Sequence, residues 1–141
     1  MDVGSVRVGV AMCDPNGILA TPLATLQRDT RNNSDISELA RLVLEHGAVG
    51  VVIGLPRTLA GAEGTSAAMA REYGQLLTDA ISPTPIAYVD ERLTTVSATR
   101  KLGQSANIGR SRATRGARAK REVIDQAAAV ELLQHWLESS R

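Results

Sequence analysis

The chain has 141 residues, of which 43% are hydrophobic and 22% charged, a composition that predicts one globular domain with a substantial core. Only 2% of the residues are aromatic, which argues against a nucleic-acid binder that stacks bases on aromatic platforms. The single cysteine, Cys13, excludes an internal disulfide and a metal site built from cysteines. With no signal-peptide pattern and no apolar run of membrane-spanning length, we expect a cytoplasmic protein that does not engage a membrane.

The first part of the chain predicts an antiparallel hairpin. Residues 6–13 (VRVGVAMC) are rich in β-branched side chains, and residues 14–17 (DPNG) have the composition of a turn. Residues 18–27 then form a second extended segment, in which Pro22 favours an edge or an end of a sheet because proline cannot donate to the ladder.

A helix is predicted next, because apolar residues recur at intervals of three and four from Ile36 onward. Asn33 or Ser34 can cap its start, and Gly47 can end it. The acid in its first turn, Asp35, is explained by the helix dipole, which favours negative charge at the N-terminus.

The rest of the chain alternates between further strands, loops and helices. The predicted segments are a strand over 48–56, a loop over 57–65, a helix over 66–80, a strand over 85–90, a short helix over 95–102, a basic loop over 100–121 and a final helix over 120–138. Strands that alternate with helices after an initial hairpin predict an α/β layered domain with a mixed sheet.

Three places in the sequence carry acids that turns, helix starts and solvated surfaces do not explain. Asp2 starts the first strand, Asp90 and Glu91 end an apolar strand, and Asp125 lies on the apolar stripe of the final helix. A carboxylate on such a stripe is costly unless it is paired or bound to a metal. Simpler readings stay open: Asp2 as a frayed terminal residue, Asp90 and Glu91 as a turn and a cap, and Asp125 as a buried acid paired with arginine.

A cluster of these acids would require a cation. If Asp2 and Asp125 come close to Glu91, three carboxylates share one place and cannot all ionise cheaply without a positive partner. An all-oxygen site suits Mg²⁺ or Mn²⁺, and two such ions can activate a water and stabilise the leaving oxygen in phosphodiester cleavage.

Charge is segregated along the chain, although the net charge is only +1. Residues 100–121 contain eight Arg or Lys and no acid, whereas the remaining residues contain eight basic and fifteen acidic side chains. This segregation predicts a polyanionic partner that binds at one place, and the alternative is a solvated loop. Metal-binding acids beside a basic loop are what a nuclease needs.

Four segments together resemble the YqgF/RuvX family of Holliday junction resolvases, and the resemblance covers essentially the whole chain in the expected order. They are DVGSVRVGVA (2–11), VVIGLPRTLAG (51–61), VDERLTTVSA (89–98) and VIDQAAAVELLQHWL (123–137). The resemblance implies that residues 1–141 form a single nuclease domain with a ribonuclease H-like fold. Its sheet would be five-stranded and mixed, an antiparallel meander followed by parallel strands, and flanked by helices.

The resemblance also implies a catalytic, metal-binding triad of Asp2, Glu91 and Asp125, with Asp90 as the alternative to Glu91. These residues would bind two Mg²⁺ or Mn²⁺ ions for in-line attack of water on a phosphodiester. Other site residues are expected to shape the site or to contact nucleic acid. The expected shaping residues are Gly4, Gly54 and Pro56, with Arg57 beside them, and the expected phosphate contacts are Arg92, Arg110, Arg112, Arg115, Arg118, Lys120 and Arg121.

The same resemblance leaves the substrate open. The expected activities are resolution of four-way DNA junctions in recombination and repair, or processing of precursor 16S ribosomal RNA in ribosome biogenesis. Because only one residue precedes Asp2, the first strand is expected to be shortened on its N-terminal side, so a third possibility is a nucleic-acid-binding protein with impaired catalysis. A two-fold symmetric junction implies a homodimer, which Cys13 could link under oxidation.

Overall fold

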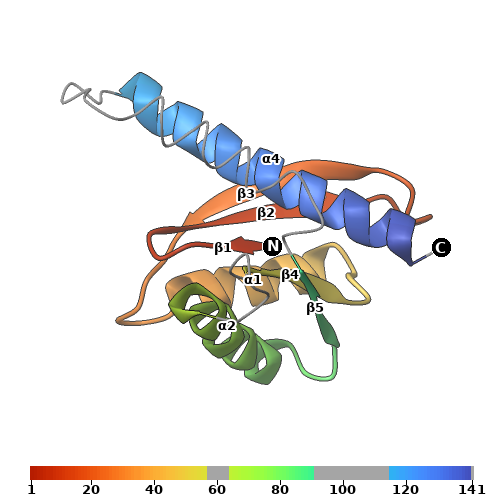
Figure 1. Ribbon diagram of the computed structural model, residues 1–141. Helices are drawn as coiled ribbons and strands as arrows, with labels where there is room; N and C mark the ends of the chain where they lie inside the picture. The colour runs from red at the N-terminus through yellow and green to blue at the C-terminus, as the bar shows by residue number, and fades with distance from the viewer. Residues whose placement is uncertain (57–63, 91–114, 141) are drawn as a thin grey trace.

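The computed structural model describes residues 1–56, 64–90 and 115–140, with the side chains of the last range described from residue 120 onward. Strands and helices alternate after an initial hairpin, which confirms the α/β class (Figure 1). The elements are β1 (Asp2–Val3), β2 (Arg7–Cys13), β3 (Ala20–Gln27), α1 (Ser34–Glu45), β4 (Val51–Leu55), α2 (Thr65–Ile81), β5 (Ile86–Asp90) and α4 (Arg115–Ser139). None of the helices in these ranges combines the length and the apolar character that crossing a membrane requires.

The predicted hairpin is confirmed as the antiparallel pair of β2 and β3. Its turn is held by the Asp14 carboxylate, whose Oδ1 atom accepts the backbone N–H of Ile18 at 2.8 Å and of Leu19 at 2.7 Å. Pro22 lies on β3, an edge strand of the described antiparallel sheet, beside a register shift at Val10 and Ala11. A proline at an edge removes no ladder hydrogen bond from the interior of a sheet.

The expected single five-stranded sheet is not confirmed. The described strands form an antiparallel sheet in the order β1-β2-β3 and a separate parallel pair of β4 and β5. The sheets meet at Met1, whose N-terminal nitrogen donates to the Val52 carbonyl at 2.5 Å and whose carbonyl accepts the Gly54 N–H at 3.0 Å. This is the hydrogen-bond pattern of parallel neighbours, but β1 contains only two residues and does not build a ladder with β4.

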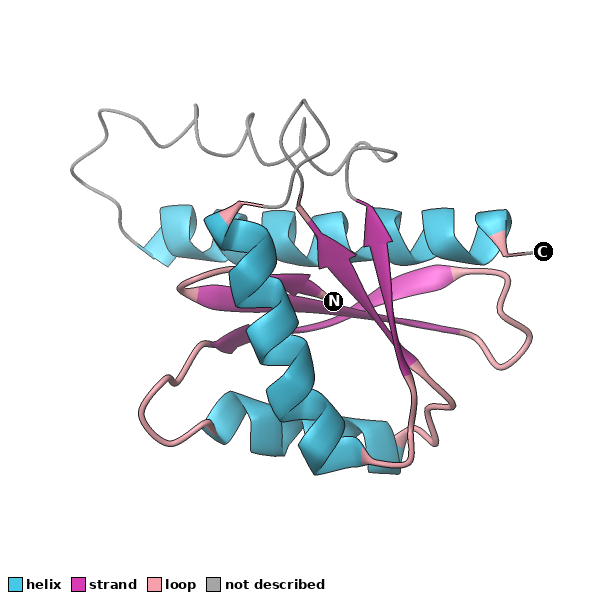
Figure 2. Ribbon diagram, turned by 60° about the horizontal axis from the view of Figure 1, so that its bottom comes forward, coloured by secondary structure: helices cyan, strands magenta, loops and turns pink. Residues whose placement is uncertain are grey.

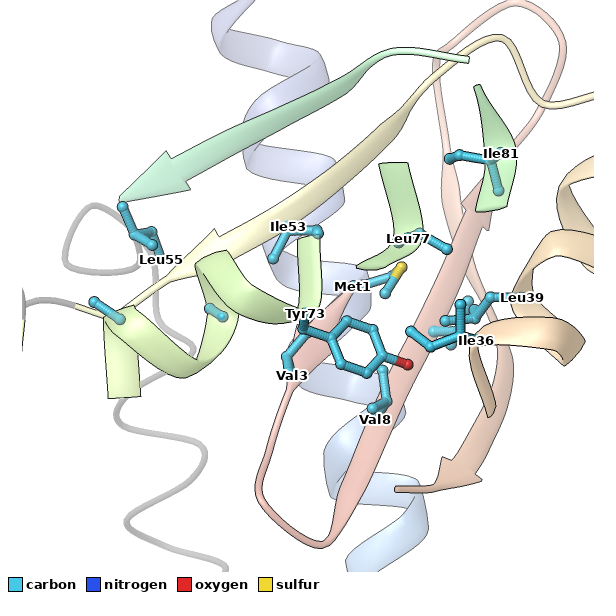
Figure 3. Packing of buried hydrophobic residues seen from close by; sticks show 13 residues of the cluster. Met1, Val3, Val8, Ile36, Leu39, Ile53, Leu55, Tyr73, Leu77 and Ile81 are labelled. Atoms are coloured by element: carbon cyan, nitrogen blue, oxygen red, sulfur yellow. The ribbon is translucent and has the colours of Figure 1, made fainter. Parts of the chain in front are cut away.

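Helices cover both faces of the strands, with α1 and α2 on one side and α4 on the other (Figures 1 and 2). The larger core lies on the α1–α2 side, where Figure 3 shows the Tyr73 ring among Val3, Val8 and Ile36. A smaller cluster around Val52, Ala128 and Leu132 packs under α4. Because successive strand residues point to opposite faces, the burial of Met1 and Val3 in the larger core directs the residue between them toward α4.

The start of α1 is organised by an acid that precedes it. Asn33 has the N-cap position with a left-handed φ of 53° and makes no side-chain cap bond. Instead, the Asp29 carboxylate accepts the Ser34 hydroxyl at 2.7 Å and the Ser34 N–H at 3.2 Å. The hydroxyl bond first, then the backbone N–H bonds from Asn32 and Ser34, lower the pKa of Asp29 to about 2. Gly47 ends the helix with a φ of 61°, as predicted.

Asp35 lies in the first turn of α1, as predicted, and its carboxylate also belongs to a buried network that the sequence did not indicate. Its side chain is fully buried, pairs with Arg28 Nη1 at 3.0 Å and accepts the Tyr73 hydroxyl at 2.7 Å. Burial, together with the hydrogen bond to Asp35, raises the pKa of Tyr73 above its usual range. The carboxylate therefore links α1, α2 and the end of β3 through the core.

The final helix begins earlier than predicted. Helix α4 starts at Arg115, so residues 115–121 are helical and do not belong to a loop. Alanine and arginine have high helix propensity, and they outweigh Gly116 in this first turn. The predicted loop over 57–65 falls largely outside the described residues, as do the short helix over 95–102 and the rest of the basic segment.

Candidate active site

Asp2 is a buried residue of the fold, with 4% of its surface exposed. It pairs with Gly9 across β1 and β2, and directly paired residues of neighbouring strands point to the same face. A Cβ atom on Gly9 would meet the backbone of Asp125, so this shared face is the one that α4 covers. The Oδ1 atom of Asp2 is buried and accepts no hydrogen bond from the part of the chain that the structure describes.

Glycine lies on both sides of Asp2. The two hydrogen bonds of Met1 set it opposite Ile53, and this register places Asp2 beside Gly54. Gly9 is its partner on the other side. Neither neighbour carries a side chain, and at Gly9 the backbone of α4 takes the space that a side chain would fill.

The close approach of α4 depends on Gly9. A Cβ atom at this position would stand 2.2 Å from the Asp125 carbonyl oxygen and 2.6 Å from its carbonyl carbon. Because Gly9 is also the register partner of Asp2, the contact that seats α4 brings Asp125 next to Asp2. Two of the three predicted acids, from the two ends of the sequence, therefore share one face.

Asp125 is paired with an arginine of the neighbouring strand. Arg7 Nε donates to Asp125 Oδ2 at 2.6 Å, and the two side chains are 23% and 21% exposed. This is the alternative that the sequence left open for Asp125, a largely buried acid paired with arginine. The pair lies at the position where the sequence predicted a metal-binding carboxylate.

Asp90 lies on the other face of the strands. It pairs with Leu55 in the parallel register of β4 and β5, and Leu55 is buried in the core between the strands and α2. Paired residues of a parallel ladder point to the same side, so the Asp90 side chain is directed away from the face that carries Asp2 and Asp125. Glu91, the preferred third acid, lies outside the described residues.

A pocket opens beside the end of β1. Its cavity volume is about 340 Å³, and its lining includes both Gly4 and Pro56, two of the residues expected to shape the site. The other lining residues are Val3, Ser5, Thr65, Ser66 and Met69. The third shaping residue, Gly54, is buried in β4, and Arg57 is outside the described residues.

The structure describes part of the predicted basic surface. Lys120 is exposed on α4 and Arg121 is partly exposed. Arg115 and Arg118 lie in the first turns of the same helix. Arg92, Arg110 and Arg112 lie outside the described residues.

The donor set around Asp2 consists of carboxylate oxygens. Within the described ranges, no group of three or more His, Cys, Asp or Glu side chains is placed to hold a metal ion. Asp2 and Asp125 nevertheless supply two hard oxygen donors on one face with glycines around them, which fits Mg²⁺ or Mn²⁺ better than a thiolate-preferring or imidazole-preferring metal.

Sequence reasoning missed Arg7, and it offered close packing at Gly9 without identifying the helix that packs there. Both lie on the predicted strand 6–13, two residues apart, and strand alternation puts them on one face. A basic residue and a glycine on one face of an otherwise apolar strand are the pattern by which the sequence could have indicated these two positions. That signal does not indicate which of the other elements covers this face.

Comparison with known proteins adds a second line of evidence. Residues 1–139 match the RuvX family, described as Holliday junction resolvase. A protein of Frankia casuarinae is 50% identical over 141 residues, which are all of this chain and 66% of that protein. One of Mycolicibacterium paratuberculosis is 52% identical over 143 residues, covering all of this chain and 79% of its own length. Both are named "Putative pre-16S rRNA nuclease". The chain described here belongs to the RuvX family.

Proposed function

We propose that this protein is a divalent-metal-dependent nuclease that hydrolyses phosphodiester bonds in nucleic acid. The observation that carries the proposal is the buried carboxylate of Asp2 on the face where α4 presents Asp125. A buried carboxylate is costly to keep charged, and a bound cation offsets that cost. The match to the family supports the same activity.

Asp2 and Asp125 are the proposed metal ligands among the described residues, and Glu91 is proposed as the third. Asp90 fits this role less well, because the register with Leu55 turns its side chain to the opposite face. Bound Mg²⁺ or Mn²⁺ would supply Lewis-acid activation of water and stabilise the leaving oxygen. The chain's own part is to hold two carboxylates at fixed places, with Asp2 on β1 between β2 and β4 and Asp125 on a helix seated against Gly9.

Two substrates are proposed, and one experiment separates them. The family description favours a four-way DNA junction, whereas the names of the relatives from Frankia and Mycolicibacterium favour precursor 16S ribosomal RNA. Purified protein with Mn²⁺ is given a synthetic four-way junction and, separately, a precursor ribosomal RNA fragment. Cleavage of the RNA alone would eliminate the junction, and cleavage of the junction alone would eliminate the RNA.

Matched variants test the metal site itself. We expect Asp2→Asn and Asp125→Asn each to lower the rate of cleavage by at least about a hundred-fold, since loss of even an indirect metal partner costs ten- to a hundred-fold. Asp79→Asn is the control, because Asp79 is exposed on α2 and contacts only the Gln75 side chain among the described bonds. Salt-sensitive binding that survives Asp125→Asn, without cleavage by the wild-type protein at any Mn²⁺ concentration, would establish a binding protein in place of a nuclease.

A homodimer is proposed together with the junction substrate, because two symmetric cuts require two active sites related by a two-fold axis. Cys13 ends β2 and is partly exposed. Light scattering on the reduced protein gives the oligomeric state. A dimer band on a non-reducing gel that Cys13→Ser removes would identify the oxidative link.

A further inference from the structure

Arg7 is the one basic side chain that the described structure places against a proposed metal ligand. Its Nε atom donates to Asp125 Oδ2 at 2.6 Å, across 118 residues of sequence. Only 23% of the Arg7 side chain and 21% of the Asp125 side chain are exposed, so water screens this pair less than a surface ion pair. For comparison, the exposed Arg41 side chain pairs with Glu38 and Glu45 along α1, on the opposite side of the strands.

Arg7 also lies close to Asp2 by the register of the sheet. Asp2 pairs with Gly9, and Arg7 is two residues from Gly9 on the same face of β2. Diagonal neighbours of this kind have Cα atoms roughly 7–8 Å apart, which is within the reach of a long side chain. The Arg7 guanidinium therefore lies on the face of the strands that carries both the Asp2 and the Asp125 carboxylates.

We propose that Arg7 is a positioning residue that holds Asp125 in the metal-free protein, and that a divalent cation must displace it from Oδ2 to bind. The inference rests on the proposed function, in which Asp125 is a metal ligand. Two carboxylates on one face repel each other, and the guanidinium compensates for part of that repulsion before a metal is present. The positive charge of the same guanidinium repels an incoming cation. Its Nε–H group also occupies Asp125 Oδ2, an oxygen that the cation would use as a ligand.

The first test measures the binding of Mn²⁺ in the absence of nucleic acid. The electron paramagnetic resonance signal of the unbound ion reports how much Mn²⁺ remains free. Arg7→Gln removes the charge, so we expect its dissociation constant for Mn²⁺ to fall about ten-fold, which corresponds to about 1.4 kcal/mol. Arg7→Lys retains the charge and should stay within about three-fold of the wild-type protein. Arg41→Gln is the control for loss of a positive charge elsewhere and should bind Mn²⁺ as the wild-type protein does. Asp2→Asn should lose Mn²⁺ binding, which identifies the bound ion measured in this assay as the one at the Asp2 site.

The second test measures the wild-type protein and uses a variant only to assign the signal. In the metal-free wild-type protein the Nε–H proton of Arg7 should exchange slowly with solvent in nuclear magnetic resonance spectra, with Asp125→Asn identifying the signal by its loss of protection. Saturating Mg²⁺ should abolish that protection. Persisting protection at saturating Mg²⁺, or Mn²⁺ binding that is unchanged or weakened in Arg7→Gln, would overturn the inference.

The two proposals fail in different ways. If the wild-type protein binds Mn²⁺ and cleaves nucleic acid but Arg7→Gln does not tighten binding, the inference is wrong and the proposed function stands. If the wild-type protein binds no Mn²⁺ at the Asp2 site, the metal-dependent function is wrong and the inference falls with it.

Discussion

Substituting Gly9 by alanine tests how the two ends of the sequence are brought together. The added Cβ atom would stand 2.2 Å from the Asp125 carbonyl oxygen, 2.6 Å from its carbonyl carbon and 3.2 Å from its Cβ atom. The first two are helix backbone atoms, which cannot rotate away as a side chain can. Helix α4 must therefore move outward by roughly 1 Å to restore an ordinary contact.

The expected cost follows from this geometry. Overpacking a well-packed contact costs typically about 1–3 kcal/mol, and a clash with backbone belongs at the upper end, so we expect Gly9→Ala to lower the free energy of unfolding by about 3 kcal/mol. The same shift moves Asp125 away from Asp2. In the proposed function Asp125 is a metal ligand, and a displacement of about 1 Å in an active site costs roughly a hundred-fold in rate, so metal-dependent cleavage should fall by that factor.

Urea denaturation followed by circular dichroism measures the stability, and the cleavage assay measures the second effect. Gly50→Ala is the matched control, because a Cβ atom there would meet Pro85 at 3.6 Å or more, an ordinary contact. Its stability should change by less than about 0.5 kcal/mol. A Gly9→Ala protein that unfolds within about 0.5 kcal/mol of the wild type would refute the close seating of α4 on β2.

Two further predictions concern the network that anchors α1. Tyr73→Phe removes the bond to the buried Asp35 carboxylate and should cost about 2 kcal/mol in urea denaturation, the range for a hydrogen bond to a charged group; an unchanged midpoint would contradict it. Asp29 has its pKa lowered from 3.8 to about 2, so its stabilising effect is complete above about pH 4 and is lost as the pH falls through 2. The urea midpoints of the wild-type protein and Asp29→Asn should therefore differ at pH 6 and converge toward pH 2, whereas a gap that does not vary with pH would contradict this assignment.

Local patterns predicted the elements that depend on short-range sequence. The turn composition of residues 14–17, the helical spacing from Ile36 and the position of Gly47 all correspond to observed features of the structure. Each of these signals acts within a few residues, through turn chemistry, amphipathic periodicity or a left-handed helix end. The sequence predicts a later start for α4 because glycine and charge favour a loop, whereas alanine and arginine continue the helix in that segment.

Predictions that required knowledge of the neighbouring element were less successful. Asp35 has an ordinary position in a first helical turn, and only the packing of α1 against α2 shows that Tyr73 and Arg28 surround its carboxylate. The resemblance to the family implied five strands in one sheet. The two-residue β1 meets β4 through hydrogen bonds at Met1 alone, which is why the described strands divide into two sheets.

The sequence by itself determined the family and pointed to the candidate site residues. Acids at Asp2 and Asp125 stand out against apolar surroundings, and the order of the four motifs identifies the family. Tertiary structure decided how these acids are arranged. The register of β1 on β2 turns Asp2 toward α4, the missing side chain of Gly9 lets α4 approach, and Arg7 takes Asp125 as its partner. The physical reason is that periodicity acts between near neighbours in the chain, whereas a contact across 118 residues exists only once the strands and helices have packed.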